Sequence, residues 1–269
     1  MPYRSLKPQS SSEDGPLLLG VVHLLALPGS PGFAGDMSAI VSAAKADAEA
    51  IMSGGMDGYI VENFGDAPFY PERVPPESIA AMAHVLALLP RHGALVGANV
   101  LRNDARSALA LAAVNDLDFI RVNVHVGAAL TDQGIIEGRA AETVRERQRL
   151  GARAAILADV DVKHASPIGA ARDIGVLAKE TRERGLADAL IVSGSATGAL
   201  TATDDLVRVK SSCPDVPLLI GSGLTLDNAS EMLAIADGAI VGTSLKRGGV
   251  LSEQVDVERV SALVQAVRS

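Results

Sequence analysis

The sequence predicts a single (β/α)₈ barrel, and three observations support this fold. From residue 17 onward, eight short apolar runs alternate with segments of helical spacing. No stretch rich in Pro and Ser separates them into two domains. The chain is 48% hydrophobic but only 3% aromatic and has no tryptophan, so Ala, Val, Ile and Leu must build the core, as in helix-covered parallel sheets. A doubly wound open sheet usually has fewer strands and would not need the eighth unit.

The apolar runs are short and end in polar or glycine-containing segments, which is typical of buried parallel strands. In chain order, the predicted strands are 17–24, 58–63, 94–101, 119–126, 154–163, 189–194, 217–223 and 238–246. Apolar residues recur at helical spacing between them, most clearly in 79–89 and 257–267. The other predicted helices are 36–53, 106–116, 139–150, 172–184, 203–213 and 226–236. Gly54, Gly151 and Gly185 stand where helix C-caps are needed.

The N-terminal 16 residues are polar and contain no apolar core of a secretory signal, so we expect a flexible lead-in before a barrel domain at 17–269. No apolar run approaches the roughly 18–20 residues of a membrane span, which predicts a cytoplasmic protein without an integral membrane segment. A formal net charge of −8 argues against a nucleic-acid partner. The single cysteine, Cys213, excludes a disulfide within the chain. We also expect a homo-oligomer, which is common for such barrels.

The loops that follow the predicted strands are longer than those that precede them, and the longest are 25–35, 64–76 and 127–138. Barrel enzymes carry their sites at the C-terminal ends of the strands, so this asymmetry predicts a site there. Three of the seven aromatic residues fall in the second loop: Phe64, Phe69 and Tyr70. These aromatic residues predict a lid or a surface on which a ligand stacks. An equal alternative is that they pack against a neighbouring subunit.

Charged residues occupy every second position near the end of the strand predicted at 154–163. They are Asp159, Asp161 and Lys163. Side chains alternate across a strand, so all three share one face. Burying three charged groups costs free energy unless they are paired with opposite charges or take part in a functional site. The pattern therefore predicts that they face the barrel interior, with Asp159 deepest and the other two at the mouth.

The neighbouring strand, predicted at 119–126, carries Arg121, Asn123 and His125 in the same alternation, while the valines between them face the helices. Two interpretations of Arg121 are equally supported. It forms an ion network with Asp159 low in the barrel, or it takes part in the site. His125 lies nearer the mouth, like Asp161 and Lys163, and this position favours a site role for all three.

More polar side chains end the first three strands, and together they form the candidate catalytic set. The set is Asp161, Lys163, Glu62, His125, Asn99, Asn123 and His23. Lys163 acts either as a proton shuttle or as an imine-forming nucleophile, and nearby carboxylates favour the shuttle because they stabilise the protonated amine. Alternatively, Glu62, His125 and Asp161, with His23, hold a divalent metal, although no compact metal-binding motif is present.

Two glycine-rich segments end the last two predicted strands and predict a phosphate site. They are Gly221, Ser222 and Gly223, and Gly242, Thr243 and Ser244. In this fold, the loops after strands seven and eight usually cradle phosphate, because glycine lets backbone N–H groups approach the anion and hydroxyls add donors. Lys246 or Arg247 is the expected source of positive charge, and 193–198 repeats the small, hydroxyl-rich character. The alternative is that barrel strands simply end in glycine-rich turns.

Several long segments also resemble a known family. They are GVVHLLALPGSP, GGMDGYIVENFGDAPF, NVLRNDA, DFIRVNVHVGAALTDQGIIEG, LADVDVKHASP, GSGLTLDNASEML and DGAIVGTSLKRGG. Over residues 17–250, the chain resembles the BtpA/SgcQ family. That family is named for a factor required to accumulate photosystem I in cyanobacteria, and other members sit among proteins of sugar and nucleoside metabolism. The resemblance implies a phosphate-binding-type barrel and leaves the reaction open.

These observations support three functions. The first is an enzyme that binds a phosphorylated sugar or nucleoside-derived metabolite and applies acid–base chemistry to it, by isomerisation, aldol-type cleavage or N-glycosidic cleavage. The second is a non-catalytic assembly or stability factor, with the aromatic loop at 64–74 as its contact surface. The third is a metal-dependent hydrolase. The sequence does not decide whether a divalent metal is a cofactor, and only the third function requires one.

Overall fold

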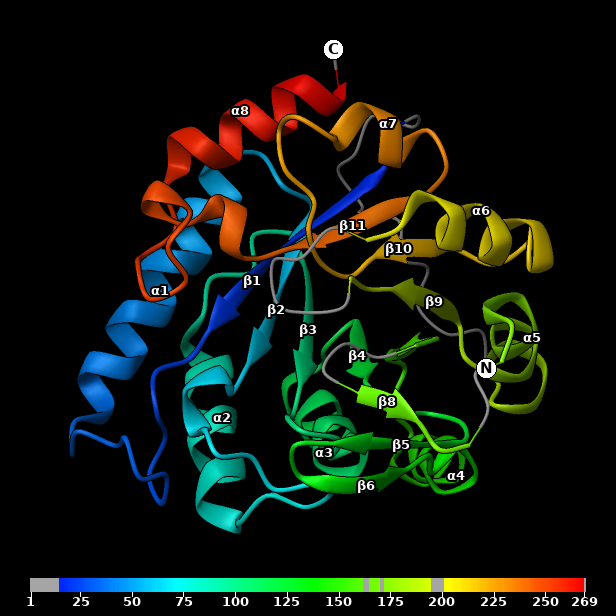
Figure 1. Ribbon diagram of the computed structural model, residues 1–269. Coiled ribbons are helices and arrows are strands. Elements are labelled where there is room, and N and C mark those ends of the chain that lie inside the picture. Colours follow the sequence, from blue (N-terminus) through cyan, green and yellow to red (C-terminus); the bar gives the residue numbers. More distant parts are fainter. Residues whose placement is uncertain (1–14, 162–164, 170–171, 195–200, 269) are drawn as a thin grey trace.

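The barrel predicted from the sequence is confirmed. The computed structural model describes residues 15–161, 165–169, 172–194 and 201–268. In this part of the chain, eight parallel strands close into a barrel in the order β1-β11-β10-β9-β7-β4-β3-β2 (Figure 1). These strands are β1 (Leu17–His23), β2 (Gly58–Glu62), β3 (Leu95–Asn99), β4 (Phe119–Val122), β7 (Ala155–Asp159), β9 (Ala189–Val192), β10 (Leu218–Ile220) and β11 (Gly238–Val241). Each ends earlier than predicted, where the chain enters the loops of the barrel mouth.

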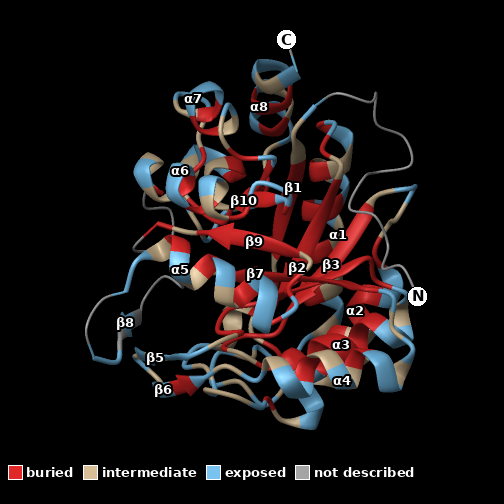
Figure 2. Cartoon of the chain, turned by 90° about the vertical axis from the view of Figure 1, so that its right-hand side faces the viewer, coloured by how far each residue is buried: buried red, intermediate tan, exposed pale blue. Residues whose placement is uncertain are grey.

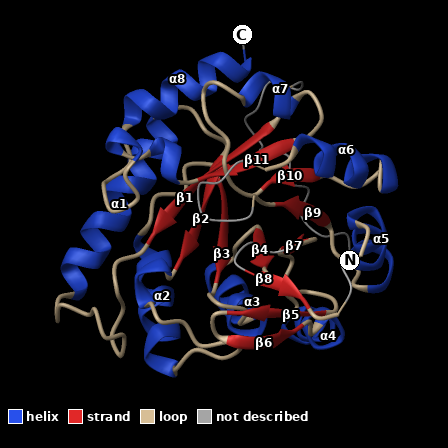
Figure 3. Ribbon diagram, in the orientation of Figure 1, coloured by secondary structure: helices blue, strands red, loops and turns tan. Residues whose placement is uncertain are grey.

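A helix follows each barrel strand and covers the outside of the barrel (Figure 3). The helices are α1 (Met37–Ser53), α2 (Pro76–Leu88), α3 (Ala105–Asn115), α4 (Ala140–Leu150), α5 (Ile174–Lys179), α6 (Thr203–Ser212), α7 (Ala229–Leu233) and α8 (Val257–Arg268). Short helical turns accompany them: η1 (Phe64–Asp66), η2 (Glu180–Arg184), η3 (Thr243–Leu245) and η4 (Arg247–Gly249). None of the helices in the described residues has the length and apolar character to cross a membrane.

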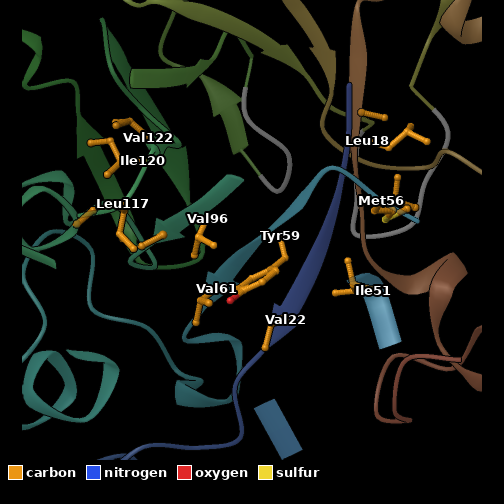
Figure 4. Close-up of a cluster of buried hydrophobic side chains, with 14 of the residues drawn as sticks. Leu18, Val22, Ile51, Met56, Tyr59, Val61, Val96, Leu117, Ile120 and Val122 are labelled. Atoms are coloured by element: carbon orange, nitrogen blue, oxygen red, sulfur yellow. The ribbon is translucent and has the colours of Figure 1, made fainter. Parts of the chain in front are cut away.

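Apolar side chains form two layers, one inside the barrel and one between the barrel and its helices. Figure 2 shows the strands buried and the outer faces of the helices exposed. Figure 4 shows part of the outer layer, where Val61 of β2 and Ile51 of α1 belong to one buried cluster. In the inner layer, Phe119 lies beside Gly97 of the neighbouring strand, and a Cβ on Gly97 would overlap the Phe119 ring. The glycine therefore makes room for an aromatic ring in an otherwise aliphatic interior.

Four aspartates repeat one arrangement at the N-terminal end of the barrel. Each directly precedes a strand, and its carboxylate accepts a hydrogen bond from a backbone N–H at the start of the preceding barrel strand. The pairs are Asp57 with Leu18 (2.8 Å), Asp118 with Val96 (2.9 Å), Asp188 with Ile156 (2.8 Å) and Asp237 with Leu218 (2.8 Å). Each aspartate N–H in turn donates to the carbonyl of the same partner. These bonds lock the strands in pairs: β1 with β2, β3 with β4, β7 with β9, and β10 with β11.

The segment 127–138, predicted as a loop, forms a hairpin. β5 (Ala128–Thr131) pairs with β6 (Gly134–Glu137), and β8 (Ala165–Pro167) pairs with the other edge of β5, both antiparallel. Ile136 is buried against Val124, whereas Leu130 and Ile135, which lie opposite each other, are exposed. Figure 1 shows this small sheet outside the barrel, beside α3 and α4.

Candidate functional site

Three of the candidate side chains lie side by side where the first barrel strands end. These strands end at His23, Glu62 and Asn99, and their register places Glu62 between the other two. Asn99 Nδ2 donates to Glu62 Oε1 at 3.1 Å. Glu62 and Asn99 are buried, whereas His23 is half-buried and edge-on to Phe64, with ring centroids 4.8 Å apart. The strand ends thus hold a fixed carboxylate next to an imidazole.

Arg121 joins the carboxylates of Glu62 and Asp159 in a buried ion network. Its Nε and Nη2 donate to the two oxygens of Asp159, each at 2.9 Å, and its Nη1 lies 3.5 Å from Glu62 Oε1. Burial alone would lower the pKa of Arg121, but the charges of Asp159 and Glu62 raise it above its usual value. Arg121 also lines the cavities of the barrel mouth, so the ion network and the site are one structure rather than alternatives.

Asn123 and Ser193 complete the hydrogen bonding of Asp159. Asn123 Nδ2 donates to Asp159 Oδ2 at 3.3 Å, and Ser193 Oγ donates to Asp159 Oδ1 at 2.9 Å. Within the described part of the chain, the buried Oδ1 of Asn123 receives no hydrogen bond. Asn123 is where the sequence places it, in the interior. Ser193 was predicted only as part of the segment 193–198, as an extension of the phosphate cradle, and its hydroxyl instead binds Asp159.

Asp161 lies two residues beyond the end of β7 and is largely exposed. It lines a hollow of about 290 Å³ that also touches Asn123 and Asp159. Desolvation raises the pKa of Asp161 above its usual value, and the carboxylates of Asp205 and Asp159 raise it further. The structure thus places Asp161 at the rim, with a perturbed carboxyl group. Lys163 lies outside the described residues, so its position at the mouth stays a prediction.

The expectation that His125 faces the barrel interior is wrong. β4 ends at Val122, so the strand alternation that predicted the orientation of His125 stops three residues before it. The His125 ring lies on the helix side of the barrel, where its Nε2 is 2.8 Å from the carbonyl of Gly185. Burial lowers the pKa of His125, which favours the neutral ring.

This placement also separates the predicted metal ligands. Glu62 lies inside the barrel, Asp161 at its rim and His125 behind the wall, so the three do not converge. In the residues that the structure describes, no group of three or more His, Cys, Asp or Glu side chains is arranged to hold a metal ion. The donor set chosen from the sequence therefore does not form a metal site.

The glycine-rich ends of β10 and β11 do line one cavity, of about 240 Å³. All six predicted residues contribute to it, together with one residue each from β1, β2 and β4: Gly221, Ser222, Gly223, Gly242, Thr243 and Ser244, with His23, Glu62 and Arg121. The three-residue helical turn η3 begins at this cavity. The cavity, here named the cradle, therefore brings the two glycine-rich strand ends next to the buried carboxylate network.

The hydroxyls of the cradle are less free than the sequence suggests. Ser244 Oγ donates to the carbonyl of Leu224 at 2.7 Å, and Ser222 Oγ accepts from the N–H of Gly194 at 2.9 Å. Both serines therefore shape the loops. Thr243, at the first position of η3, is the better candidate for a hydroxyl donor to a ligand.

Lys246 was predicted to supply positive charge here, and that prediction is wrong. Lys246 is buried and forms an ion pair with Asp47 of α1 at 2.6 Å, so it ties the end of the barrel to its first helix. The cradle instead has Arg259 of α8 in its wall, with Nε donating to the carbonyl of Ser244 at 2.8 Å. Arg259 lies on α8, the helix that follows β11, and no local sequence pattern marks it. Arg247 does not line this cavity.

A second cavity, of about 580 Å³, adjoins the cradle and is here named the aromatic cavity. Phe64 and Phe69 line it, with ring centroids 6.4 Å apart, whereas Tyr70 is exposed and does not. The polar part of its lining is formed by Glu62, Asn99, Arg102, Arg121, Asn123 and Asp132. Arg102 and Asp132 were not candidates in the sequence, because they lie in loops whose direction no periodicity predicts. The aromatic loop therefore forms a wall of the site, with two of its three rings.

The sequence model of one protein family, described as the BtpA family, matches residues 15–269. The chain belongs to the BtpA family. The photosystem I biogenesis protein BtpA of Synechocystis is 47% identical over 93% of this chain and 87% of its own length. An uncharacterized protein of Thermococcus kodakarensis is 44% identical over 93% and 95% of the two chains. A third relative, an uncharacterized mitochondrial protein of Caenorhabditis elegans, is 35% identical over 94% of each chain.

Two solved structures share the barrel fold of this BtpA-family chain. Thiamine phosphate pyrophosphorylase of Pyrococcus furiosus superposes with a TM-score of 0.58 at 15% identity, covering 94% of this chain and 95% of that one. Phosphoribosyl anthranilate isomerase of Thermus thermophilus gives 0.55 at 12% identity, with 94% and 98% covered. At these identities the likeness shows the fold alone.

Proposed function

We propose that this protein binds a phosphorylated sugar or nucleoside-derived metabolite in the barrel mouth and converts it by acid–base chemistry. The observation that carries the proposal is that the cradle and the aromatic cavity meet. Glu62 and Arg121 line both of them. A ligand whose phosphate lies on the glycine-rich loops would place its carbon skeleton against this buried carboxylate network.

Each part of the mouth has a chemical role in this proposal. Backbone N–H groups of the glycine-rich strand ends, the hydroxyl of Thr243 and the charge of Arg259 hold the phosphate. Glu62, positioned by its hydrogen bond from Asn99, is the candidate general base. Asp161, whose pKa is raised, is the candidate acid at the rim. Lys163 stays a predicted proton shuttle, and isomerisation, aldol-type cleavage or N-glycosidic cleavage all fit this set.

The names of two structural neighbours support the class of ligand. Phosphoribosyl anthranilate isomerase and thiamine phosphate pyrophosphorylase are both named for phosphorylated compounds. In such barrels, the loops after the last two strands are the frequent phosphate site, and the cradle lies on those loops here.

A second candidate function is assembly, because the relative from Synechocystis is named as a photosystem I biogenesis protein. In this role the protein would bind another protein through an exposed surface and have no turnover. The relatives from Thermococcus kodakarensis and Caenorhabditis elegans are named as uncharacterized proteins, so their names favour neither role.

We also propose the location, oligomeric state and partners of the protein. We place it in the cytoplasm as a homo-oligomer with a phosphorylated small molecule as its ligand, without a nucleic-acid partner. Of the lead-in predicted at residues 1–16, residues 1–14 lie outside the described residues. The exposed pair of Leu130 and Ile135 on the hairpin is a surface that a second copy would cover.

Thermal unfolding with matched sugars tests the function. Ribose 5-phosphate or fructose 6-phosphate is expected to raise the Tm, and the free sugars are not, because the cradle recognises the phosphate. A ligand at 100 times its Kd adds about 2.7 kcal/mol of stability, which gives a measurable shift. Gly242→Val should abolish the shift, because a Cβ at this position lies 3.0 Å from His23 Cε1 and a larger side chain fills the cradle.

Two further variants make the test specific. Thr243→Ala should weaken binding about tenfold through the loss of one hydrogen bond to a charged group. Ser211→Ala removes an exposed hydroxyl on α6 that lines neither cavity, and it should bind like the parent protein. Equal shifts with free and phosphorylated sugars, or no shift with any of them, would refute phosphate binding. The second result would turn attention to protein partners.

A further inference from the structure

The side-chain amide of Asn123 is a buried polar group of the barrel mouth to which the proposed function gives no role. Asn123 follows directly after β4, and only 2% of it is exposed. Its Nδ2 donates to Asp159 Oδ2 at 3.3 Å, whereas its Oδ1 has no donor among the described residues. Burying an amide oxygen without a donor costs free energy, so such an atom in the wall of a site calls for an explanation.

The contacts of Asp159 decide which end of the Asn123 amide is left without a partner. Asp159 Oδ2 already accepts from Arg121 Nε at 2.9 Å, so it faces Asn123 as an acceptor. The NH₂ end of the amide must therefore turn to Asp159, and the oxygen must turn away from it. The opposite orientation would bring two acceptors together. The free group is thus an acceptor that needs a donor from elsewhere.

The backbone on both sides of Asn123 is held in place. Val122, the residue before it, ends β4 and is paired with Ala158 of β7. Val124, the residue after it, exchanges two backbone hydrogen bonds with the side chain of Asn103, at 2.8 and 2.9 Å. Asn123 therefore cannot easily move to find a donor within the protein. An acceptor that is fixed and unpaired is prepared for a ligand.

Asn123 also lies where two cavities of the mouth meet. It lines the aromatic cavity together with Glu62, and it lines the hollow of about 290 Å³ together with Asp161. Among the lining residues that the structure describes, Asn123 is the one that these two cavities share. The candidate base and the candidate acid therefore each share a cavity with it. A ligand that extends from one of them toward the other would contact Asn123.

We propose that Asn123 Oδ1 accepts a hydrogen bond from a hydroxyl on the carbon skeleton of the phosphorylated ligand. The proposal rests on the function proposed above and specifies the substrate class: a sugar phosphate with a hydroxyl at the carbon that meets Asn123, and not its deoxy counterpart. An uncharged amide oxygen suits an uncharged donor. A site with a buried acceptor discriminates against a ligand without the matching donor, because the acceptor then stays unpaired. Asn123 is thus a specificity-determining residue.

Deoxy analogues test this assignment on the parent protein by calorimetry. Ribose 5-phosphate is compared with its 2-deoxy and 3-deoxy analogues, and fructose 6-phosphate with its 3-deoxy and 4-deoxy analogues. At least one analogue should bind about tenfold more weakly than the compound that keeps all its hydroxyls, the order expected for a buried acceptor left unpaired. The position of the missing hydroxyl identifies the group that Asn123 binds.

Variants then attribute the difference to Asn123. Asn123→Leu has a similar shape but no acceptor, so it should bind the deoxy analogue at least as tightly as the full sugar phosphate. Asn123→Ala removes the same acceptor with less bulk and should give the same result. Ser193→Ala is the matched control: it also takes one donor away from Asp159 but leaves Asn123 in place, so it should keep the preference. Because the preference is a ratio of two affinities within one variant, a general loosening of the ion network cancels from it.

The negative results have different meanings. Equal binding of each sugar phosphate and its deoxy analogues, with the Gly242→Val variant still inactive in binding, would overturn the role of Asn123 and leave the cradle intact. A preference that persists in Asn123→Leu and Asn123→Ala would also overturn it, because another residue would then bind the hydroxyl. Binding of none of these compounds would overturn the proposed function and this inference with it.

Discussion

Two carboxylates two residues apart, at the end of β7, have opposite environments. Asp159 is buried and receives both donors of the Arg121 fork, whereas Asp161 is largely exposed and has carboxylate neighbours. Asp159 is therefore held in the framework by its hydrogen bonds from Arg121. Asp161 has its pKa raised by desolvation and by Asp205 and Asp159, which brings its protonation equilibrium closer to neutral pH. This difference supports the proposal that Asp159 is structural and that Asp161 transfers a proton.

The raised pKa of Asp161 predicts a pH-dependent effect of Asp161→Asn. The folded protein binds this proton more tightly than the unfolded chain does, so the group stabilises the fold below the usual pKa of aspartate, and this contribution is lost as pH rises through the folded-state pKa. The variant cannot ionise there. Its Tm should exceed that of the parent protein at about pH 7 and match it near pH 3.5, below the usual aspartate value.

Thermal unfolding across this range measures the difference. Asp205→Asn provides a second check, because removing the neighbouring charge should lower the pKa of Asp161 and shrink the advantage of Asp161→Asn. A Tm difference that does not change with pH would show that Asp161 titrates normally.

The residues of the site were predictable only as far as the strands continue. Alternation correctly placed Arg121, Asn123 and Asp159 inside the barrel, because β4 and β7 run through or close to these positions. It failed for His125, where the chain has left the strand and turned outward. Arg102 and Arg259 were missed for a related reason. Their positions depend on loop conformation and on the packing of α8, which no local pattern encodes.

At the scale of elements, the N-terminal end of the barrel is the rigid side. The repeated aspartates join neighbouring strands there, while the long loops, the hairpin and the cavities lie at the other end. The eight strands and the helices were readable from apolar runs and helical spacing. The hairpin at 128–137 was not, because its turn is formed by Asp132 and Gln133 rather than by a glycine pair, and its strands have only four residues each.

Asp118→Ala should destabilise the protein by about 1.5–3 kcal/mol, because it removes a charge-assisted hydrogen bond and leaves the N–H of Val96 buried without this acceptor. Urea unfolding measures the change in the free energy of unfolding. Asp36→Ala is the matched control, since Asp36 caps the exposed start of α1 and its loss should cost about 1 kcal/mol. Equal effects of the two would mean that the buried aspartate adds nothing beyond an ordinary cap.

At the scale of the whole molecule, an aromatic ring in the barrel interior packs against a glycine of the neighbouring strand. Phe119 is fully buried, and Gly97 is its register partner on β3. Interiors of this density do not absorb an added methyl group without movement. The composition predicted an aliphatic core but not this contact, since the pairing of Gly97 with Phe119 depends on the barrel register.

Gly97→Ala should therefore destabilise the barrel by about 1–3 kcal/mol, the usual cost of overpacking. Phe119→Leu, which shortens the ring that a Cβ on Gly97 would overlap, should recover part of this loss, so the two changes are non-additive. Urea unfolding of both single variants and the double variant gives the coupling energy. Gly15→Ala, where a Cβ meets only atoms 3.9 Å away, should be close to neutral. If the effects of Gly97→Ala and Phe119→Leu on the free energy of unfolding were strictly additive, the cost of Gly97→Ala would not come from contact with the Phe119 ring.

The repeated aspartates also give the ring of strands a repeated base. Each carboxylate acts within one pair of strands. The carbonyls of Asp57, Asp118 and Asp237 accept N–H groups from the strand beyond that pair, those of Leu95, Ala155 and Leu17. The same residue therefore joins its own pair of strands and ties that pair to the next, while the loops at the mouth differ from one pair to another. The varied cradle, aromatic wall and hairpin thus stand on a base of fourfold repetition.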